Sequence, residues 1–174
     1  MNLPNKLTVL RVLMIPFFVF FMLYPDEQGW MKWAALVVFV AASLTDLLDG
    51  KIARKYNMVT NFGKFMDPLA DKLLVCSALI CFVATAQVPA WVVIVIISRE
   101  FIISGFRLIA SDKGVVLAAG MSGKIKTVLQ MMMTIVVIAD IPGLELIEQV
   151  LIYASLIMTV VSMIDYLYHN KDVL

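Results

Sequence analysis

Six apolar stretches, each about as long as a membrane-spanning helix, take up most of this 174-residue chain. A transmembrane helix needs about 20 predominantly apolar residues. Hydrophobic residues make up 62% of the chain and charged residues only 16%, whereas a soluble domain carries roughly 45–50% and about 25%. A single soluble core of this size could not bury the excess. The sequence therefore predicts an all-α integral membrane protein with six transmembrane helices, over residues 7–23, 31–48, 68–86, 89–111, 124–139 and 144–168.

Lysine and arginine residues are concentrated on one side of this predicted topology. Cytoplasmic loops of membrane proteins carry an excess of both residues, and the connections on the opposite side contain only Lys32. We therefore expect a multi-pass protein of the cytoplasmic (inner) cell membrane, with both termini and the 49–67 connection facing the cytoplasm. Without an internal repeat or a low-complexity linker, residues 1–174 are predicted to form a single domain. The basic residues on the predicted cytoplasmic side are Lys6, Arg11, Lys51, Arg54, Lys55, Lys64, Arg107, Lys113, Lys124, Lys126 and Lys171.

Four aspartates flank the 49–67 connection at helical spacing. Two are three residues apart and two are four residues apart, so each pair lies on one helical face. A carboxylate at membrane depth costs about 2.5–3.5 kcal/mol on insertion scales, and four such charges also repel one another. Two hard divalent cations, Mg²⁺ or Mn²⁺, would relieve both costs; solvated acids paired with neighbouring basic residues are the alternative. The four residues are Asp46, Asp49, Asp67 and Asp71.

Two glycines and an arginine accompany the aspartates. Gly50 follows one aspartate directly, and Gly63 lies four residues before another. Small residues let a ligand approach the backbone closely, although tight helix packing is the alternative for each glycine alone. Arg54 offers a planar fork suited to phosphate. Divalent cations and an arginine around a diphosphate indicate a phosphoryl-transfer site, in which positioning and charge neutralisation dominate catalysis.

The complete pattern resembles the signature of the CDP-alcohol phosphotransferase family. This resemblance implies a six-helix membrane fold, commonly homodimeric, with two divalent cations near the cytoplasmic side. It also implies a reaction in which an alcohol displaces CMP from a CDP-linked donor. The matching residues are Asp46-x-x-Asp49-Gly50-x-x-Ala53-Arg54, then eight residues, then Gly63-x-x-x-Asp67-x-x-x-Asp71.

The resemblance also implies roles for individual residues. The four aspartates would ligate the cations, and Asp71 would in addition be the general base for the acceptor hydroxyl. Asn5 and Thr8, in a segment that is similar to the N-terminal region of the family, would approach the nucleotide; a helix start capped by Asn5 is the alternative. The residues expected to line the CDP-diacylglycerol site are Asn5, Thr8, Gly50, Ala53, Arg54 and Gly63.

Residues 98–130 are similar to the corresponding stretch of family members that use glycerol 3-phosphate as the acceptor. The resemblance then implies transfer of a phosphatidyl group from CDP-diacylglycerol to glycerol 3-phosphate, with membrane lipid and a second copy of the chain as partners and no nucleic acid. Arg99 and Glu100 interrupt an apolar segment, where an unpaired charge would be costly. Membrane anchoring by basic residues is the alternative. The expected glycerol 3-phosphate site comprises Arg99, Arg107, Lys124 and Lys126.

Two other functions stay open on the sequence alone. The same chemistry could use inositol phosphate, serine or phosphatidylglycerol as the acceptor. A small cation transporter could also place acidic residues in a membrane, but it would be expected to carry them near mid-span and often to show repeat symmetry.

Overall fold

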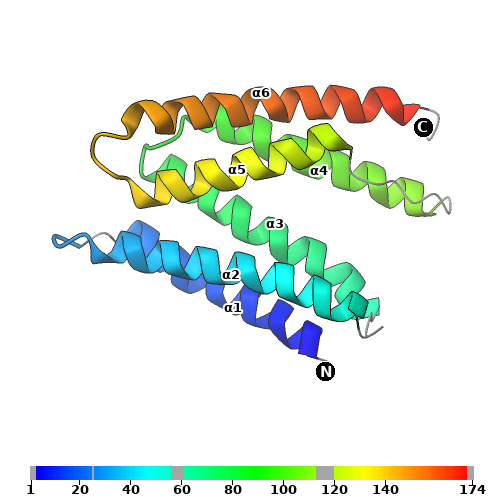
Figure 1. Cartoon of the computed structure of the whole chain (residues 1–174), viewed down its shortest axis with the longest axis horizontal. Coiled ribbons are helices and arrows are strands. Elements are labelled where there is room, and N and C mark those ends of the chain that lie inside the picture. The colour runs from blue at the N-terminus through cyan, green and yellow to red at the C-terminus, as the bar shows by residue number, and fades with distance from the viewer. Residues whose placement is uncertain (1–2, 25, 56–60, 113–119, 172–174) are drawn as a thin grey trace. The chain divides into compact units, whose positions relative to one another are not determined.

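The computed structural model describes residues 3–24, 26–55, 61–112 and 120–171. Within these helices, the side chains of residues 3–4, 46–55, 61–68, 71 and 112 lie outside the description. The described chain is all-helical and contains no strand, which confirms the predicted all-α class (Figure 1). Its six helices are α1 Leu3–Leu23, α2 Trp30–Lys55, α3 Asn61–Ala84, α4 Ala90–Asp112, α5 Met121–Ala139 and α6 Glu145–His169.

The polar connection predicted over residues 49–67 is mostly helical. α2 continues past residue 48 to Lys55, and α3 begins at Asn61, before residue 68. Hydropathy marks where a helix would leave the lipid, but not where its hydrogen bonds end. Lysine and arginine are good helix formers in water, so a helix can continue through a charged stretch. The two helices thus extend beyond the predicted membrane spans on both sides of this connection.

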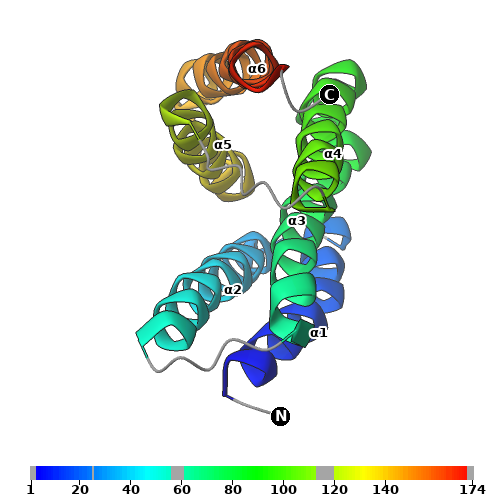
Figure 2. The same ribbon diagram turned by 90° about the vertical axis from the view of Figure 1, so that its right-hand side faces the viewer.

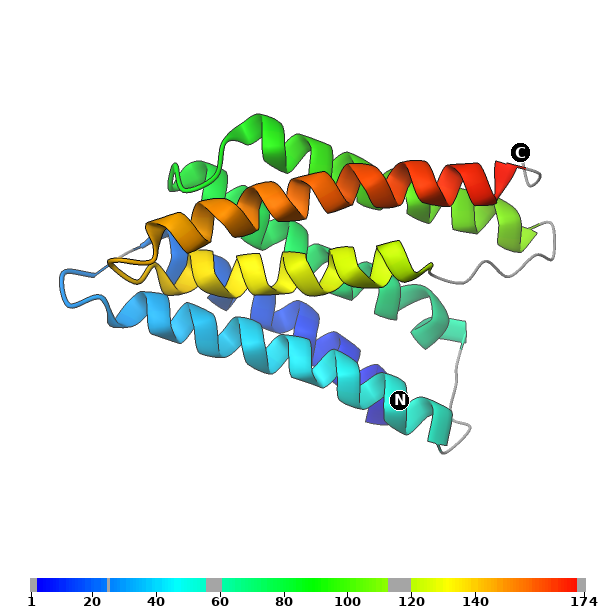
Figure 3. The same cartoon turned by 45° about the horizontal axis from the view of Figure 1, so that its top comes forward.

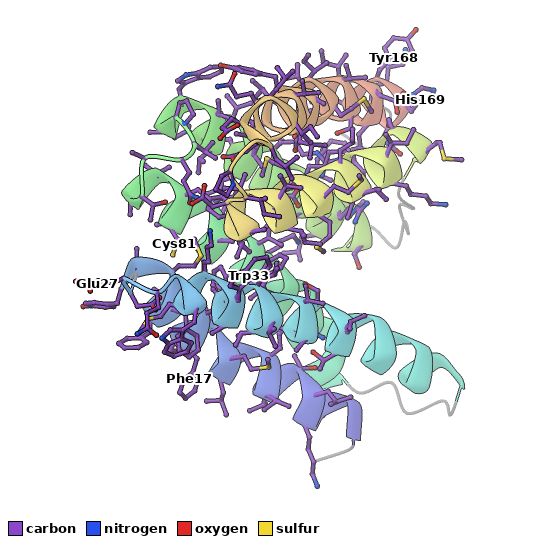
Figure 4. All side chains as sticks on the ribbon, turned by 60° about the vertical axis from the view of Figure 1, so that its left-hand side comes forward. Phe17, Glu27, Trp33, Cys81, Tyr168 and His169 are labelled. Atoms are coloured by element: carbon purple, nitrogen blue, oxygen red, sulfur yellow. The ribbon has the colours of Figure 1, made fainter. Side chains whose placement is uncertain are left out.

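Three helices in the described part of the chain are long and apolar enough to cross a membrane, judged by length and composition. They are Asn5–Leu23 within α1, Met121–Ala139 and Glu145–His169, while Trp30–Thr45 and Lys72–Ala84 form shorter apolar helices. α4 has the length of a span but carries Arg99, Glu100 and Arg107 among its apolar residues. These helices expose large apolar side chains, Phe17 and Trp33 among them (Figure 4). Such surfaces are those of a membrane protein.

The chain divides into two compact units, Met1–Thr85 and Ala86–Leu174. The prediction of one domain over residues 1–174 stays a prediction. In the N-terminal unit, α1 packs against both α2 and α3 (Figure 2). Phe18 of α1 and Phe39 of α2 are fully buried, with ring centroids 5.8 Å apart.

The turn before α2 is held by Asp26. Its carboxylate accepts hydrogen bonds from the backbone N–H groups of Met31 at 3.0 Å and Trp30 at 3.3 Å. Desolvation raises the pKa of Asp26, but these hydrogen bonds outweigh it and hold the pKa below its ordinary value. The carboxylate thus satisfies donors that the first turn of a helix cannot pair internally.

In the C-terminal unit, α6 packs against α4 and α5. α5 and α6 form an antiparallel hairpin (Figure 3), joined by a tight turn in which Asp140 and Gly143 both have positive φ angles of 42° and 89°. The Asp140 N–H donates to the Val136 carbonyl at 3.1 Å and ends α5. The end of α6 therefore lies beside the start of α5, where Ser122 contacts Asp165. The contact between Arg107 and Tyr166 places the C-terminal part of α4 at the same end of this unit.

Candidate functional site

The predicted metal ligands occupy the last turns of α2 and the first turns of α3. Both stretches are helical, so the three- and four-residue spacings keep each pair of aspartates on one face. The side chains of these aspartates lie outside the described residues. Among the described side chains, no group of three or more His, Cys, Asp or Glu residues could hold a metal ion. The predicted residues outside the description are Asp46, Asp49, Gly50, Ala53, Arg54, Gly63, Asp67 and Asp71.

A buried polar face of α1 packs against α2 one turn before the first aspartate. Asn5, Thr8 and Arg11 follow one another at three-residue spacing, and all three are buried. Arg11 donates from Nε to the Ala42 carbonyl of α2 at 3.3 Å, and Ala42 precedes Asp46 by one turn. Because α1 begins at Leu3, Asn5 lies inside the helix and is not its N-cap.

From the sequence, Arg11 was counted only among the basic residues of the predicted cytoplasmic side. Its side chain is fully buried, and it joins the helix that carries Asn5 and Thr8 to the helix that carries Asp46 and Asp49. The three-residue period of Asn5, Thr8 and Arg11 was the available signal, because it places a cation on the same face as two predicted nucleotide contacts.

In the C-terminal unit, one carboxylate joins two buried cations. Glu100 Oε1 lies 3.2 Å from Arg99 Nη1 and also accepts a hydrogen bond from Lys126 Nζ of α5. Arg99 is 8% exposed and Lys126 only 3% exposed. Gly123 lies one turn before Lys126, and a Cβ atom there would lie 3.6 Å from Arg99 Nη2. The Arg99 guanidinium thus lies close to α5 at Gly123, at a distance that would also accommodate a methyl side chain.

In this cluster, Arg99–Glu100–Lys126, two cations share one carboxylate oxygen. Arg99 Nε has no hydrogen-bond partner among the described residues. A buried cation with a spare donor is costly unless an anion completes its surroundings. Glu100, which was absent from the predicted site residues, is the side chain that holds Arg99 and Lys126 together. The arrangement is chemically suited to a phosphate group.

Arg107 lies two turns after Arg99 on α4 and makes a different set of contacts. Its Nε donates to the Tyr166 hydroxyl of α6 at 3.3 Å, and its guanidinium carbon lies 5.5 Å from the centre of the Tyr166 ring. Arg107 itself is exposed, as is Lys124 on α5. The four predicted acceptor residues therefore fall into a buried pair, Arg99 and Lys126, and two exposed residues.

A further set of polar contacts joins α5 to the end of α6. The Ser122 hydroxyl donates to an Asp165 carboxylate oxygen, and the other oxygen lies 3.0 Å from His169 Nδ1. His169 is exposed at the end of α6 (Figure 4). These contacts tie the start of α5 to the last turns of α6, at the end of the unit where Arg107 lies.

Comparison with known proteins gives the same family over nearly the whole chain. The family model described as CDP-alcohol phosphatidyltransferase matches residues 1–161. The chain is 43% identical over 187 residues to the CDP-diacylglycerol–glycerol-3-phosphate 3-phosphatidyltransferase of Bacillus subtilis (strain 168), covering 99% of this chain and 97% of that protein. It is 38% identical over 183 residues to the Haemophilus influenzae protein of the same name, covering 98% and 94%.

A third relative is the probable phosphatidylglycerophosphate synthase of Mycobacterium tuberculosis, which is 36% identical over 167 residues, or 95% of this chain and 79% of that protein. The resemblance that the aspartate and glycine spacing carries is thereby confirmed. The chain belongs to the CDP-alcohol phosphatidyltransferase family.

Proposed function

We propose that this protein transfers the phosphatidyl group of CDP-diacylglycerol to glycerol 3-phosphate, giving phosphatidylglycerophosphate and CMP. The observation that carries this proposal is the similarity to the B. subtilis relative, whose name states the donor and the acceptor, over 99% of this chain and 97% of that protein. The aligned region thus also includes the 98–130 stretch, which bears on the acceptor.

In this proposal Asp46, Asp49, Asp67 and Asp71 hold two divalent cations, Mg²⁺ or Mn²⁺. The donor set fits, because hard cations prefer carboxylate oxygens and both pairs stand at helical register in α2 and α3. When bound, the cations supply charge neutralisation for the diphosphate of the donor.

The reaction itself needs one proton acceptor and one good leaving group. Asp71 takes the proton from the C1 hydroxyl of glycerol 3-phosphate. That oxygen attacks the phosphorus that bears the diacylglycerol, a new P–O bond forms, and the bond to CMP breaks. The donor would be held by Gly50, Ala53, Arg54 and Gly63, and by Asn5 and Thr8, which the described part of α1 buries on a single polar face.

The phosphate of glycerol 3-phosphate is assigned to Arg99, Lys126, Arg107 and Lys124. The burial of both cations supports this assignment for the first two residues, as does Arg99 Nε, which has no hydrogen-bond partner among the described residues. Arg107 and Lys124 are exposed cations near the same end of the unit, where they would attract an anionic acceptor.

We further propose that all six helices cross the cytoplasmic membrane and that both termini and the active site face the cytoplasm. The distribution of lysine and arginine among the connections supports this orientation. The family resemblance supports a homodimer and a single functional domain over residues 1–174, with membrane lipid surrounding the helices.

A panel of acceptors tests the proposed reaction. Purified protein in detergent would receive labelled CDP-diacylglycerol, Mg²⁺ or Mn²⁺ and one acceptor at a time. We expect labelled phosphatidylglycerophosphate with glycerol 3-phosphate and no comparable product with inositol phosphate, serine or phosphatidylglycerol. Preferred turnover of another acceptor would overturn the acceptor assignment but keep the chemistry. No turnover with any of them would overturn the proposal.

Two aspartate variants test the proposed site. Asp71→Asn removes the base, so kcat should fall by about 10²–10⁴-fold, and Asp49→Asn removes a ligand and should shift the Mg²⁺ dependence of the rate as well. Asp140→Asn is the matched control, because it makes the same change at a turn residue with a positive φ angle, which asparagine adopts readily. Near-normal activity in Asp49→Asn or Asp71→Asn would refute the assignment.

A further inference from the structure

We propose that Tyr166 is a positioning residue for the acceptor, because it holds the Arg107 guanidinium in the orientation that receives the phosphate of glycerol 3-phosphate. This inference rests on the proposed function and deepens it at one residue. The family match ends at residue 161, so Tyr166 lies outside the pattern by which the family is recognised. Its assignment comes from its contacts alone.

Tyr166 makes two contacts with the same guanidinium. The Arg107 Nε–H donates to the tyrosine hydroxyl at 3.3 Å, and the guanidinium carbon lies 5.5 Å from the ring centre. The hydroxyl contact restrains the guanidinium at Nε, and the ring adds a cation–π attraction. Arginine has five N–H donors, and the Nε contact uses one of them. The two terminal amino groups can therefore still form a bidentate contact with a phosphate.

The tyrosine that holds Arg107 is itself firmly placed. Tyr166 is 6% exposed and packs in a small buried cluster with Ile103 and Phe106 of α4, to which Leu167 adds partly buried surface. The Phe106 and Tyr166 rings meet edge to face, with centroids 5.9 Å apart at 81°. Close packing in such a cluster restricts the rotamers of the ring, so the hydroxyl is held in position beside Arg107.

Arg107 needs such a partner because its side chain is long and exposed. A free arginine loses rotamer freedom when it binds a ligand, and this loss weakens binding. Contact with Tyr166 restricts the side chain before the acceptor arrives. If Arg107 binds the acceptor phosphate, loss of the tyrosine hydroxyl should therefore weaken acceptor binding and leave the chemical step unchanged.

The test is the steady-state kinetics of Tyr166→Phe with glycerol 3-phosphate varied at saturating CDP-diacylglycerol. The variant keeps the ring and its packing but removes the hydroxyl. We expect the KM for glycerol 3-phosphate to rise by about 3- to 10-fold, the size expected for loss of a typical intramolecular hydrogen bond. The kcat, the KM for CDP-diacylglycerol and the Tm should stay close to those of the parent protein. A purely structural role for Tyr166 would lower Tm or kcat without this selective change in KM.

Tyr168→Phe is the matched control. It makes the same change two residues later on α6, at a side chain that is 70% exposed and whose ring lies 5.7 Å from Lys171 Nζ. Its KM for glycerol 3-phosphate should equal that of the parent protein. Arg107→Lys is a second variant, for use if Tyr166→Phe folds poorly. It keeps the charge and leaves Tyr166 intact but lacks the Nε–H donor, so the KM for glycerol 3-phosphate should rise.

Combination with Arg107→Ala separates failure of this inference from failure of the proposed acceptor site. Arg107→Ala alone should raise the KM for glycerol 3-phosphate, and adding Tyr166→Phe should then change nothing further. If Arg107→Ala leaves the KM unchanged, Arg107 is not an acceptor residue, and that part of the proposed function falls with the inference. If Arg107→Ala raises the KM but Tyr166→Phe does not, or if Tyr166→Phe acts equally without Arg107, only the inference is overturned.

Discussion

Replacement of Glu100 by glutamine should destabilise the protein more than replacement of either cation that Glu100 contacts. Glutamine keeps the size of the side chain but removes the only carboxylate in the Arg99–Glu100–Lys126 cluster. Two cations would then stand at one site, with Arg99 8% and Lys126 3% exposed. Loss of one partner from a buried ion pair leaves an uncompensated charge and costs about 3–5 kcal/mol.

The structure places the expected cost at the lower end of this range, because the Glu100 side chain is 18% exposed and some water screens the site. A loss of about 3 kcal/mol corresponds to a fall in Tm of about 6–12 °C for a chain of this size, at about 2–4 °C per kcal/mol. Lys126→Met should cost less, because it removes a buried cation while Glu100 keeps Arg99 at 3.2 Å. The double variant Glu100→Gln with Lys126→Met should recover part of the Tm lost by Glu100→Gln alone.

Thermal unfolding in detergent, followed by intrinsic tryptophan fluorescence, measures all four proteins. Lys124→Met is the matched control, because Lys124 is exposed on the same helix two residues before Lys126, and its Tm should stay within about 1–2 °C of the parent value. A Glu100→Gln protein as stable as the parent would refute the reasoning. So would a Lys126→Met protein that is less stable than Glu100→Gln, or a double variant that is the least stable of all.

Two further predictions concern single polar groups. Ser155→Ala should leave Tm unchanged or raise it, because the fully buried Ser155 hydroxyl has no hydrogen-bond partner in the described part of the chain. Thr159→Val removes a hydroxyl that donates to the Ser155 carbonyl at 2.7 Å, so it should lower Tm by about 2–4 °C. A lower Tm for Ser155→Ala than for Thr159→Val would contradict the argument. For Asp26, whose pKa is lowered in the folded state, the stabilisation is complete above the ordinary pKa of about 3.9 and is lost as the pH falls through the lower folded value. The Tm difference between the parent and Asp26→Asn should therefore shrink between pH 5 and the lowest pH at which the protein stays folded. A difference independent of pH would contradict a stabilising role for the hydrogen bonds that the Asp26 carboxylate accepts.

The helices were predictable from the sequence because length and apolarity determine where a chain can cross a lipid bilayer. Each of the six predicted segments corresponds to one helix of the described structure. The number of helices is thus confirmed for the described chain, whereas a membrane crossing by each helix stays a prediction. The exact helix ends near the aspartates depend on hydrogen bonding in a charged stretch, to which a hydropathy pattern is insensitive. Helix α2 continues to Lys55, beyond the predicted end of the membrane span at residue 48.

The candidate site likewise contains some residues that the sequence pattern reveals and others that it does not. Residues that act in a fixed local spacing, such as Asp46 with Asp49, are visible in the sequence because a helix converts spacing into a shared face. Glu100 and Tyr166 are not visible in this way. Their partners lie 26 and 59 residues away in the chain, and only the packing of α4 with α5 and α6 brings these pairs together. A sequence pattern contains no such information unless the pairing is already known.

The two most deeply buried cations of the described chain lie near the starts of their helices. Arg11 and Lys126 are 0% and 3% exposed, and each lies within the first three turns of its helix, α1 or α5. A charge at mid-membrane costs about 2.5–3.5 kcal/mol on insertion scales, and this cost falls toward the surface, where water and headgroups are within reach. Both helices would start on the cytoplasmic side in a six-span topology. In that proposed topology, Arg11 and Lys126 would lie toward the cytoplasmic surface, at which the aspartates of α2 and α3 are proposed to bind the donor diphosphate.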